Sequence, residues 1–511
     1  MTLETFFEKF NQFADAPNAV AKMRELVLDL AVRGRLLSSC SLDSSAPSDP
    51  SGPFSIPQDW QWIALNKAAD CRAAAKVDSA SLNDTDWVLD LEDIDGGAGK
   101  VIATATFAER RSLSTKASFQ KGDVLYGKLR PYLNKVVIAD RPGFCTTEII
   151  PLRPQTFVAA GYLRVFLRSP HFLRYAAAKN YGMKMPRLGT QDLESAAVPL
   201  PPLAEQKRIV AKVDELMALC DRLALQQQER ETRHAALARA SLARFADAPT
   251  PANLPFLFHP SYAIPPADLR KSILTLAVQG LLVPHDAESA DWETRKLKEL
   301  TTKMGSGSTP SGGKESYQET GVPLIRSMNV HFGGFVRHGL AFLNDEQAEK
   351  LRNVTVKADD VLLNITGASI GRVATAPKDM EGARVNQHVC ILRPTAEIIP
   401  PFLELFLASP VVQNLIDDVQ VGATREALTK AMIEQFEIPV PSLAEQRRIV
   451  AKVEQLMALV DALETQLAAS RATAANLLSA FVAELTGSPH NGKLSFPSAS
   501  TTGSRGRPRK A

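Results

Sequence analysis

Residues 199–224 read PLPPLAEQKRIVAKVDELMALCDRLA, and residues 439–464 read PVPSLAEQRRIVAKVEQLMALVDALE. The two stretches lie 240 positions apart and agree at 18 of 26 positions. A repeat with so long a period and only two copies is not that of a solenoid. It predicts a molecule with a pseudo-twofold internal repeat.

Each copy predicts a long α-helix. Ser442 with Glu445 three residues later is a capping box, and prolines precede both starts. Neither run contains Gly or Pro before Pro249 and Gly487, so each helix should span about 43 residues, or roughly 65 Å. A heptad seam runs through Ile449, Val453, Leu456, Val460, Leu463, Leu467, Ser470, Ala474, Leu477 and Phe481, and through Ile209, Val213, Leu216, Cys220 and Leu223. Each stripe needs a partner, so the two helices are expected to form an antiparallel coiled coil.

A shorter repeat links MRELVLDLAVRGRLL (23–37) with LRKSILTLAVQGLLV (269–283). The second copy follows the first long helix through a Pro-rich connection, whereas the first copy stands at the chain start. No such segment follows the second long helix. We therefore expect residues 18–39 to dock where that missing copy would lie, which makes the two halves equivalent in a circular sense.

The diverged segments between the repeats read as mixed α and β structure. Short apolar runs between Gly, Pro and Asp turns predict strands at 124–126, 136–138, 148–152, 361–365, 373–375 and 388–392. Residues 162–178 and 402–418 predict short helices. The expected fold class is α+β, with two mixed α/β domains separated by the pair of long antiparallel helices.

Composition excludes several classes of protein. The 511 residues include 59 Lys+Arg and 56 Asp+Glu, for a net charge of +3; without Arg505, Arg507, Arg509 and Lys510 the balance is −1. Any nucleic-acid surface in the body must therefore be local. No run of about 18 apolar residues exists, and the start MTLETFFEKF is not a signal peptide. Five widely spaced cysteines support neither a zinc ribbon nor a disulfide framework, so we expect a cytoplasmic protein without metal.

Motifs for catalysis are missing. GSGSTPSGGKE (305–315) does not fit a phosphate-binding loop, and there is no HExxH and no Asn/Asp-Pro-Pro-aromatic tetrapeptide. GASIG (367–371) matches GxSxG, but a strand and not a helix is expected after it, so Ser369 reads as a turn residue. The acidic groups at 90–93 and 359–360 read as solvated turns. We expect a non-catalytic protein.

Candidate DNA-reading residues are Arg, Lys, Asn, Gln, Ser and Thr side chains within the diverged segments, because these groups recognise base edges and phosphates. The first segment offers Lys128, Arg130, Lys135, Lys184 and Arg187. The second offers Ser308, Thr309, Arg326, Asn329, Arg372, Asn386, Gln387 and Arg425. The tail SRGRPRK (504–510) resembles an AT-hook of the A·T minor groove, with a solubilising tail as the alternative.

The paired motif P-x-P-x-L-A-E-Q-[KR]-R-I-V-A-K-V, each copy opening a long helix, resembles the repeated regions of the specificity subunit of type I restriction–modification systems. The LAV-x-G-x-L segments fit the same family. So do IPQDWQWIAL (56–65), DWETRKLKEL (291–300), GSTP (307–310), GDVLYGKLRPYLNK (122–135) and TGASIGRV (366–373). The resemblance covers residues 18–486; the AT-hook-like tail lies outside it.

The resemblance implies two target-recognition domains, each reading one half of a bipartite, asymmetric site on double-stranded DNA. The helices would set the spacer and dock two methylase subunits, which restriction/translocase subunits would join. S-adenosylmethionine, ATP and Mg would belong to those partners, with no cofactor in this chain. The residues shared by both helix starts either contact the methylase subunits or cap and solubilise the helices: Glu205, Gln206, Arg208, Glu445, Gln446 and Arg448.

These inferences divide the chain into six parts: an N-terminal helical segment that packs with the C-terminal repeat (1–40), the first recognition domain (41–202), a central helical region with linker (203–285), the second recognition domain (286–441), the C-terminal long helix (442–487) and a disordered basic tail (488–511). One alternative is a structural coiled-coil protein that associates with DNA without sequence-specific restriction. Another is a stand-alone DNA-modifying enzyme, which would transfer methyl groups without partners.

Overall fold

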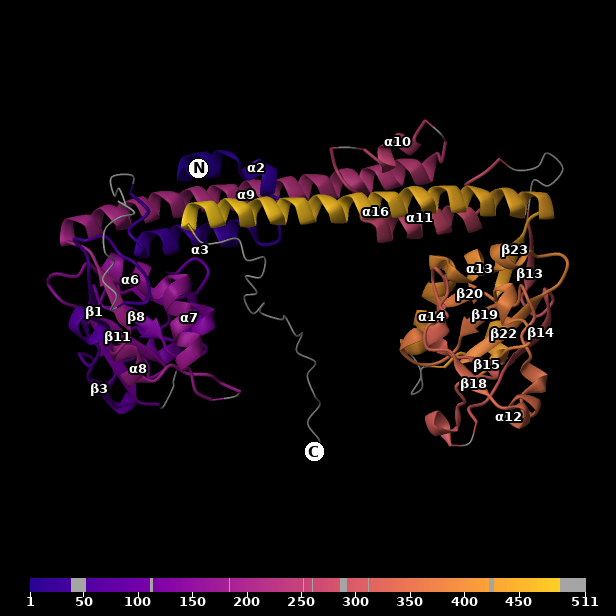
Figure 1. Cartoon of the computed structure of the whole chain (residues 1–511), viewed down its shortest axis with the longest axis horizontal. Coiled ribbons are helices and arrows are strands. Elements are labelled where there is room, and N and C mark those ends of the chain that lie inside the picture. The colour runs from indigo at the N-terminus through magenta and orange to yellow at the C-terminus, as the bar shows by residue number, and fades with distance from the viewer. Residues whose placement is uncertain are drawn as a thin grey trace. The chain divides into compact units, whose positions relative to one another are not determined.

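A computed structural model describes residues 1–37, 52–110, 114–182, 184–250, 252–259, 261–284, 292–310, 312–421 and 427–487 (Figure 1). The AT-hook-like tail and Arg425 lie outside these residues. The chain forms two compact units, Met1–Glu229 with Ser470–Ala511, and Arg230–Ala469. Each unit combines one mixed domain with parts of both long helices.

The two long helices are α9 (Leu203–Asp247) and α16 (Leu443–Thr486), which confirms both predicted helices. The Ser442 hydroxyl accepts a hydrogen bond from the backbone N–H of Glu445 at 3.1 Å, as a capping residue does. In the first unit, Leu216 of α9 belongs to the same apolar cluster as Leu478 of α16. In the second unit, Phe245 clusters with Val460. The beginning of each helix thus packs with the end of the other, so the pair is antiparallel.

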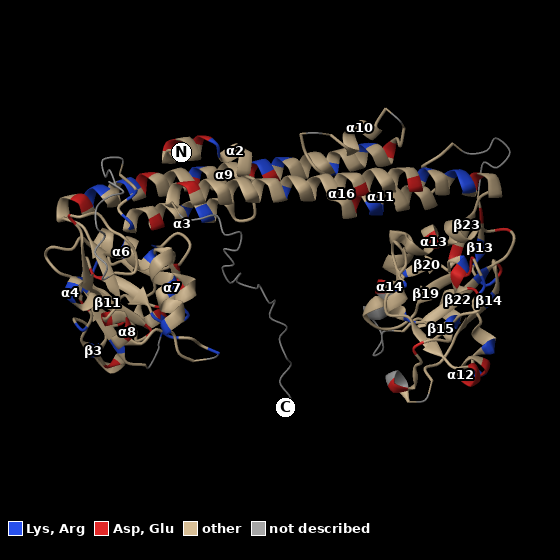
Figure 2. Ribbon diagram, in the orientation of Figure 1, with Lys and Arg blue, Asp and Glu red and all other residues tan. Residues whose placement is uncertain are grey.

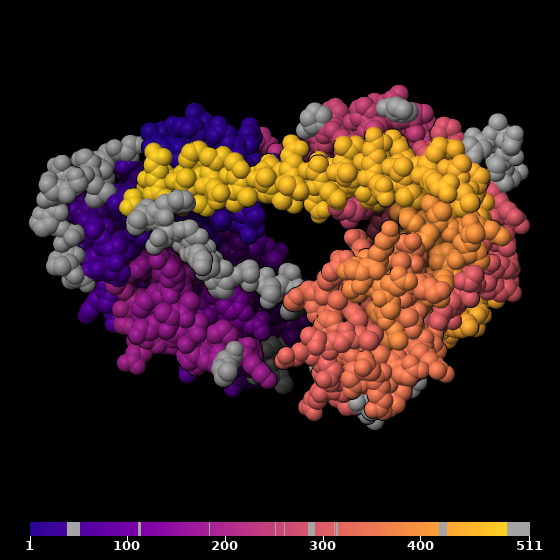
Figure 3. Space-filling model, turned by 45° about the vertical axis from the view of Figure 1, so that its right-hand side comes forward, coloured from indigo at the N-terminus to yellow at the C-terminus, as the bar shows by residue number. Residues whose placement is uncertain are grey.

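The apolar seam changes its spacing near the end of each helix. Ile449, Val453, Leu456 and Val460 are buried as predicted, but beyond Ala474 the buried residue is Leu478 and the prediction of Leu477 is wrong. The equivalent step in α9 ends on the buried Ala238. A straight α-helix has 3.6 residues per turn, so a stripe with a strict heptad spacing of 3.5 gradually drifts around the helix. Two successive spacings of four residues bring the buried side chains back to the side that faces the partner. The outer side of α16 is open to solvent (yellow in Figure 3).

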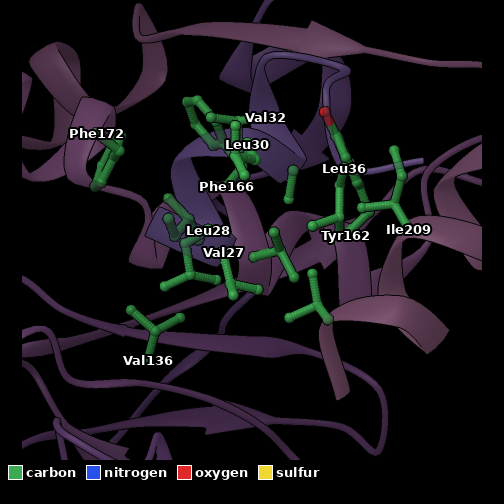
Figure 4. Close-up of a cluster of buried hydrophobic side chains, with 14 of the residues drawn as sticks. Val27, Leu28, Leu30, Val32, Leu36, Val136, Tyr162, Phe166, Phe172 and Ile209 are labelled. Carbon is green, nitrogen blue, oxygen red and sulfur yellow. The ribbon is translucent and has the colours of Figure 1, made fainter. Parts of the chain in front are cut away.

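Short helices cover the long pair in each unit. The first unit uses α1 (Leu3–Glu8), α2 (Phe10–Phe13) and α3 (Ala19–Val32), and the second uses α10 (Leu254–Leu257) and α11 (Pro266–Val278). Arg24 of α3 donates to Asp221 at 2.7 Å, and Arg270 of α11 donates to Asp461 at 2.6 Å. The chain start therefore occupies in one unit the place that α11 occupies in the other. Its apolar face packs into the core with Tyr162, Phe166 and Ile209 (Figure 4).

The first mixed domain is built from small sheets covered by helices. A four-stranded antiparallel sheet has the order β2 (Ala69–Asp70), β11 (Ile149–Pro154), β8 (Val124–Gly127), β9 (Val136–Ile138). A second has the order β3 (Lys76–Val77), β7 (Lys116–Phe119), β10 (Gly143–Thr146), β4 (Val88–Leu89). β1 (Gln61–Ala64) pairs with β12 (Ala197–Leu200), and β5 (Ile94–Asp95) with β6 (Lys100–Val101). The helices are α4 (Leu65–Ala68), α5 (Phe107–Arg110), α6 (Ala160–Arg168), α7 (Pro170–Lys179) and α8 (Thr190–Glu194).

The second mixed domain repeats this plan. Its four-stranded sheet has the order β14 (Thr301–Ser306), β22 (Val389–Pro394), β19 (Val361–Asn364), β20 (Val373–Thr375). A second sheet has the order β18 (Ala341–Leu343), β15 (Val322–Ile325), β21 (Arg384–Val385). β13 (Glu293–Lys296) pairs with β23 (Glu437–Val440), and β16 (Val330–His331) with β17 (Gly334–Phe335). The helices are α12 (Asp345–Lys350), α13 (Pro400–Ala408), α14 (Pro410–Val421) and α15 (Lys430–Glu434).

The predicted fold class and all six predicted strands are confirmed. The short helices predicted over 162–178 and 402–418 are confirmed, and each segment holds a pair of them, α6–α7 and α13–α14. The breaks fall at Ser169-Pro170 and Ser409-Pro410. A proline ring cannot continue a preceding helix but suits the first position of a new one.

One buried glutamine joins each mixed domain to its long helix. Gln206 accepts from the Ala159 N–H at 2.8 Å and donates to the carbonyls of Phe157 and Pro201 at 3.0 and 2.9 Å. Gln446 does the same with Ile399, Glu397 and Pro441 at 2.9, 2.9 and 3.0 Å. Both side chains are at most 1% exposed. Each amide satisfies three backbone groups that would otherwise be buried without a partner.

Buried acid–base pairs replace some of the predicted solvated turns. Asp123 binds Arg153 through two contacts of 3.0 Å, and Asp360 binds Arg393 at 2.7 and 2.8 Å. Asp360 is fully buried, and its carboxylate is the main reason that the pKa of Arg393 is raised. Asp93 is also buried and pairs with Arg110. The interpretation of Asp93 and Asp360 as solvated residues is therefore wrong.

We predict that Gln446→Ala lowers the free energy of unfolding by about 3–5 kcal/mol, because three buried backbone groups lose their partner. Calorimetry should show this as a lower midpoint for the unfolding of the second unit. Arg447→Ala, an exposed change at the next position, should stay within about 0.5 kcal/mol of the parent. Equal midpoints for Gln446→Ala and Arg447→Ala would contradict the joining role.

Candidate nucleic-acid interface

Equivalent loops come together at one end of the main sheet in both domains. In the first domain, the β8–β9 loop binds the segment before α8, because the Arg130 N–H donates to the Pro186 carbonyl at 2.7 Å and the Leu188 N–H to the Lys128 carbonyl at 3.0 Å. In the second, the β19–β20 loop meets the segment before α15, where the Leu428 N–H donates to the Ile365 carbonyl at 2.8 Å. We call these the first and second loop pairs, and count with the second the neighbouring residues 308–309, 331 and 387–388, which hydrogen bonds connect to the β19–β20 loop. They carry several of the predicted DNA-reading residues.

Two of the five predicted cations of the first domain are exposed, and a third is partly accessible to solvent. Arg130 and Lys184 are exposed, and Lys128 is half-buried. Arg187 is held by both carboxylate oxygens of Glu148 at 2.9–3.1 Å, and these hydrogen bonds raise the pKa of its guanidinium. Lys135 donates to the Leu91 carbonyl at 2.5 Å. Arg187 and Lys135 therefore brace the loops, whereas Arg130, Lys184 and Lys128 remain predicted DNA contacts.

The second domain holds a chain of polar side chains that links three loops. The Thr309 hydroxyl donates to the Gln387 side chain, whose Nε2 lies 3.1 Å from Nε2 of His388. Nδ1 of His388 in turn contacts the Thr366 hydroxyl. Ser308, beside Thr309, is exposed, as is Gln387. The chain fixes the orientation of exposed donors and acceptors, which is what reading a base edge requires.

Arg372 lies beside this chain. An open depression of about 490 Å³ is lined by Ser327, Met328, Thr366, Gly367, Ala368, Ser369, Arg372 and His388. No acidic side chain lines it. The Arg372 guanidinium lies 3.4 Å from Nδ1 of His331, whose other ring nitrogen contacts the Met328 carbonyl at 2.9 Å. The structure thus brings Arg372 into the second loop pair, close to the Thr309–His388 chain.

Three other predicted residues of the second domain have internal contacts. Asn329 is fully buried and donates to the carbonyls of Val336 and His338. Asn386 is 4% exposed, and its side chain accepts from the His388 N–H at 3.1 Å. Arg326 donates to the Gly339 carbonyl and lies 5.5 Å from the Tyr317 ring centre. The buried amides of Asn329 and Asn386 satisfy backbone groups, so the structure contradicts a base-reading role for them.

The predicted docking residues divide in the same way. Gln206, Gln446 and Glu445 are buried, and Glu205 accepts from the Trp60 indole N–H at 3.1 Å. The two glutamines cannot reach a partner subunit, so the docking prediction for them is wrong, and their internal hydrogen bonds give the reason. Arg208 and Arg448 are exposed, and Arg448 also donates to the Pro284 carbonyl at 3.3 Å. For these two arginines docking remains a prediction.

Sequence reasoning missed Thr366, His331 and His388 as members of the second loop pair. His388 directly follows the predicted Gln387. Its other partner, Thr366, is far away in the sequence and reaches it only through the pairing of β19 with β22. The predicted turn at GASIG is confirmed, since Gly367–Ser369 forms a single 3-10 turn before β20.

Both signs of charge occur in each unit. Lys and Arg residues are interspersed with Asp and Glu residues along the ribbon of both units, as Figure 2 shows. No helix in the described part of the chain is long and apolar enough to cross a membrane. Fixed polar loops on two similar domains, joined to paired helices, define a class of two-domain recognition proteins.

The chain belongs to the family described as the type I restriction modification DNA specificity domain, whose model matches residues 98–231 and 289–470. Each match includes its own loop pair and the first part of the long helix that follows.

Named relatives are similar over different lengths. The chain is 28% identical to the EcoDI type I restriction enzyme specificity subunit of Escherichia coli over 40% of its own length and 48% of that protein. It is 22% identical to the EcoAI specificity subunit of the same species over 86% of its own length and 89% of that protein. A solved chain from a study of complex assembly and conformational transition of the type I R-M system has 22% identity and a TM-score of 0.55, over 85% of this chain and 99% of that one. This last likeness concerns the fold.

We predict that Arg372→Ala weakens binding of the assembled complex to its DNA site at least about tenfold and relaxes the choice of bases in one half-site only, because one arginine–base contact is worth about 1–3 kcal/mol. Fluorescence anisotropy with a panel of duplexes mutated base by base would measure both effects. Arg352→Ala, which removes an exposed arginine of the same domain outside the loop pair, serves as the control. Uniform weakening over all sequences would reassign Arg372 to a phosphate contact.

Proposed function

We propose that this chain is the DNA specificity subunit of a type I restriction–modification system, in which each recognition domain reads one half of a bipartite site. The observation that carries the proposal is the second loop pair. Its exposed Gln387 and Ser308, with Thr309 and Arg372, are the side-chain types that read base edges, and neighbouring hydrogen bonds fix several of them.

The site is asymmetric. The two domains share the strand order and the glutamine joint, but their loop pairs carry different residues, with Arg130 and Lys184 in the first and Gln387 and Arg372 in the second. A shared frame with different exposed side chains reads different bases in the two halves of the site. A purely structural coiled-coil protein gives no reason for such loops to differ, and that alternative is not favoured.

The helix pair sets the spacer between the two half-sites and docks two methylase subunits. A continuous helix has a fixed rise of about 1.5 Å per residue, so the number of residues in the helix sets its length. Arg208 and Arg448 occupy equivalent exposed positions on the two copies and offer the same contact twice. Restriction/translocase subunits join this assembly.

Chemistry belongs to the partner subunits. Adenine methylation from S-adenosylmethionine and Mg- and ATP-dependent cleavage are carried out by the methylase and restriction subunits, and this chain supplies sequence recognition without catalysis. It acts in the cytoplasm, where the DNA and the partner subunits are found.

Mapping methylated adenines over the host genome, with and without the gene for this chain, tests the proposal. A split, asymmetric motif that disappears on deletion supports it and gives both half-sites and the spacer together. If methylase subunits that co-purify with the chain methylate DNA without any split motif, the proposal fails.

We further predict that replacing residues 54–200 by the first recognition domain of another family member changes one half-site and leaves the other half-site unchanged. The reason is that Gln206 and the β1–β12 pair join this domain to α9 through contacts of its own unit. The same methylation map is the measurement, and the reciprocal replacement of the second domain is the control. A change in both half-sites after one replacement would contradict the two-reader arrangement.

A further inference from the structure

The first loop pair exposes an unusual number of apolar side chains. Tyr132 is 55% exposed and Leu133 40% in the β8–β9 loop, while Tyr181 is 59% and Met185 44% exposed in the segment before α8. Apolar side chains gathered on exposed loops mark a surface that another molecule covers. Figure 1 shows the loop between α7 and α8 (magenta) reaching out from the body of its domain.

The backbone under these side chains is held by hydrogen bonds. Tyr181 and Arg187 exchange two backbone hydrogen bonds of 3.0 and 2.9 Å, which hold these two residues of the segment before α8 together. The bidentate pair between Arg187 and Glu148 anchors them to the stretch between β10 and β11. Arg130 has a φ of 50°, a conformation that side chains other than Gly, Asn and Asp rarely adopt, and it precedes a proline. Tyr181 and the hairpin that carries Tyr132 are therefore held by backbone hydrogen bonds.

The charge around the tyrosines selects a polyanion as the partner. Arg130 and Lys184 are exposed on the same two loops, with Lys128 half-buried beside them. Glu148 contacts these loops and is neutralised by Arg187, and a second acid, Asp192 of α8, lies beside Gly189. Aromatic rings interleaved with cations suit nucleic acid, whose bases offer flat faces and whose phosphates offer negative charge.

The second loop pair offers a different chemistry in the equivalent place. Ser369 stands in its hairpin where the first hairpin carries Tyr132, whereas Ile370 keeps an apolar residue at the place of Leu133. The exposed aromatic ring at this hairpin position is thus a feature of the first domain, and the second has a hydroxyl there.

We propose that Tyr132 and Tyr181 are specificity-determining residues of the first half-site, and that their rings stack on bases and open a base step there. This inference rests on the proposed function and adds the mode of recognition. Opening a step is cheapest at flexible pyrimidine–purine steps, so the first half-site should contain one. Discrimination would then come from how easily the step opens as well as from contacts to base edges.

The test uses the full chain assembled with its methylase subunits and a duplex carrying the mapped motif. 2-Aminopurine is placed at successive positions of the first half-site, where its fluorescence rises if binding unstacks it. Wild type should give a rise at one step. Tyr132→Ala with Tyr181→Ala should abolish the rise and weaken binding about ten- to a hundredfold, since stacking on an aromatic side chain contributes on that order per base.

Phenylalanine variants separate the ring from the hydroxyl. Tyr132→Phe with Tyr181→Phe keeps the rings and should retain the fluorescence rise and bind within about threefold of wild type. Ile102→Ala, which removes an apolar side chain that is 65% exposed in the same domain, is the matched control and should bind like wild type. Arg372→Ala should weaken binding but leave the fluorescence rise in the first half-site.

Three results would overturn the inference. The alanine pair could bind and unstack DNA like wild type, or the phenylalanine pair could be as weak as the alanine pair, which would assign the contact to the hydroxyl groups. The alanine pair could instead lose its methylase subunits on purification, which would make this surface a protein-docking site. Failure of the proposed function is a separate result, because the wild-type complex would then show no preference for any split site.

Discussion

Each long helix of about 45 residues carries an apolar stripe that must be buried from solvent. The arrangement of this protein follows from how the two stripes are buried. Each long helix packs its first part against the last part of its twin, and short helices cover what remains. Because the chain start supplies α3 in one unit and the linker supplies α11 in the other, both units close in the same way. The pseudo-symmetry is therefore a consequence of covering two copies of one stripe.

The buried glutamines connect the long helices to the recognition domains. Gln206 and Gln446 each satisfy backbone groups of the loop before α6 or α13 and of the prolines that open the long helix. A side-chain amide with two donors and an acceptor fits such a junction, and an apolar residue would leave those groups unpaired. The domain is thereby fixed to the helix by contacts that do not involve its loops. The loops are left free to differ, and their chemistry has diverged between the two halves.

The sequence predicted the helices and strands well, because periodicity and proline punctuation are local signals. It predicted the candidate site less well. Arg372, Gln387 and Thr309 come together as candidates, but Asn329 and Asn386 proved to be buried caps, and a one-dimensional pattern cannot distinguish an amide that satisfies backbone from one that faces solvent. His388 was not predicted, because its contact with Thr366 forms only across paired strands and leaves no local signal in the sequence.

By itself the sequence determined the two-copy plan, the long helices, the strands and the family, since all of these are encoded in repeats and in the spacing of apolar residues. Only the tertiary structure decided which polar residues are available. Gln206 and Gln446 are repeated between the two copies as faithfully as Arg208 and Arg448, yet the glutamines are buried and the arginines are exposed. Exposure depends on which elements lie against a side chain, and that is settled by contacts between residues far apart in the chain.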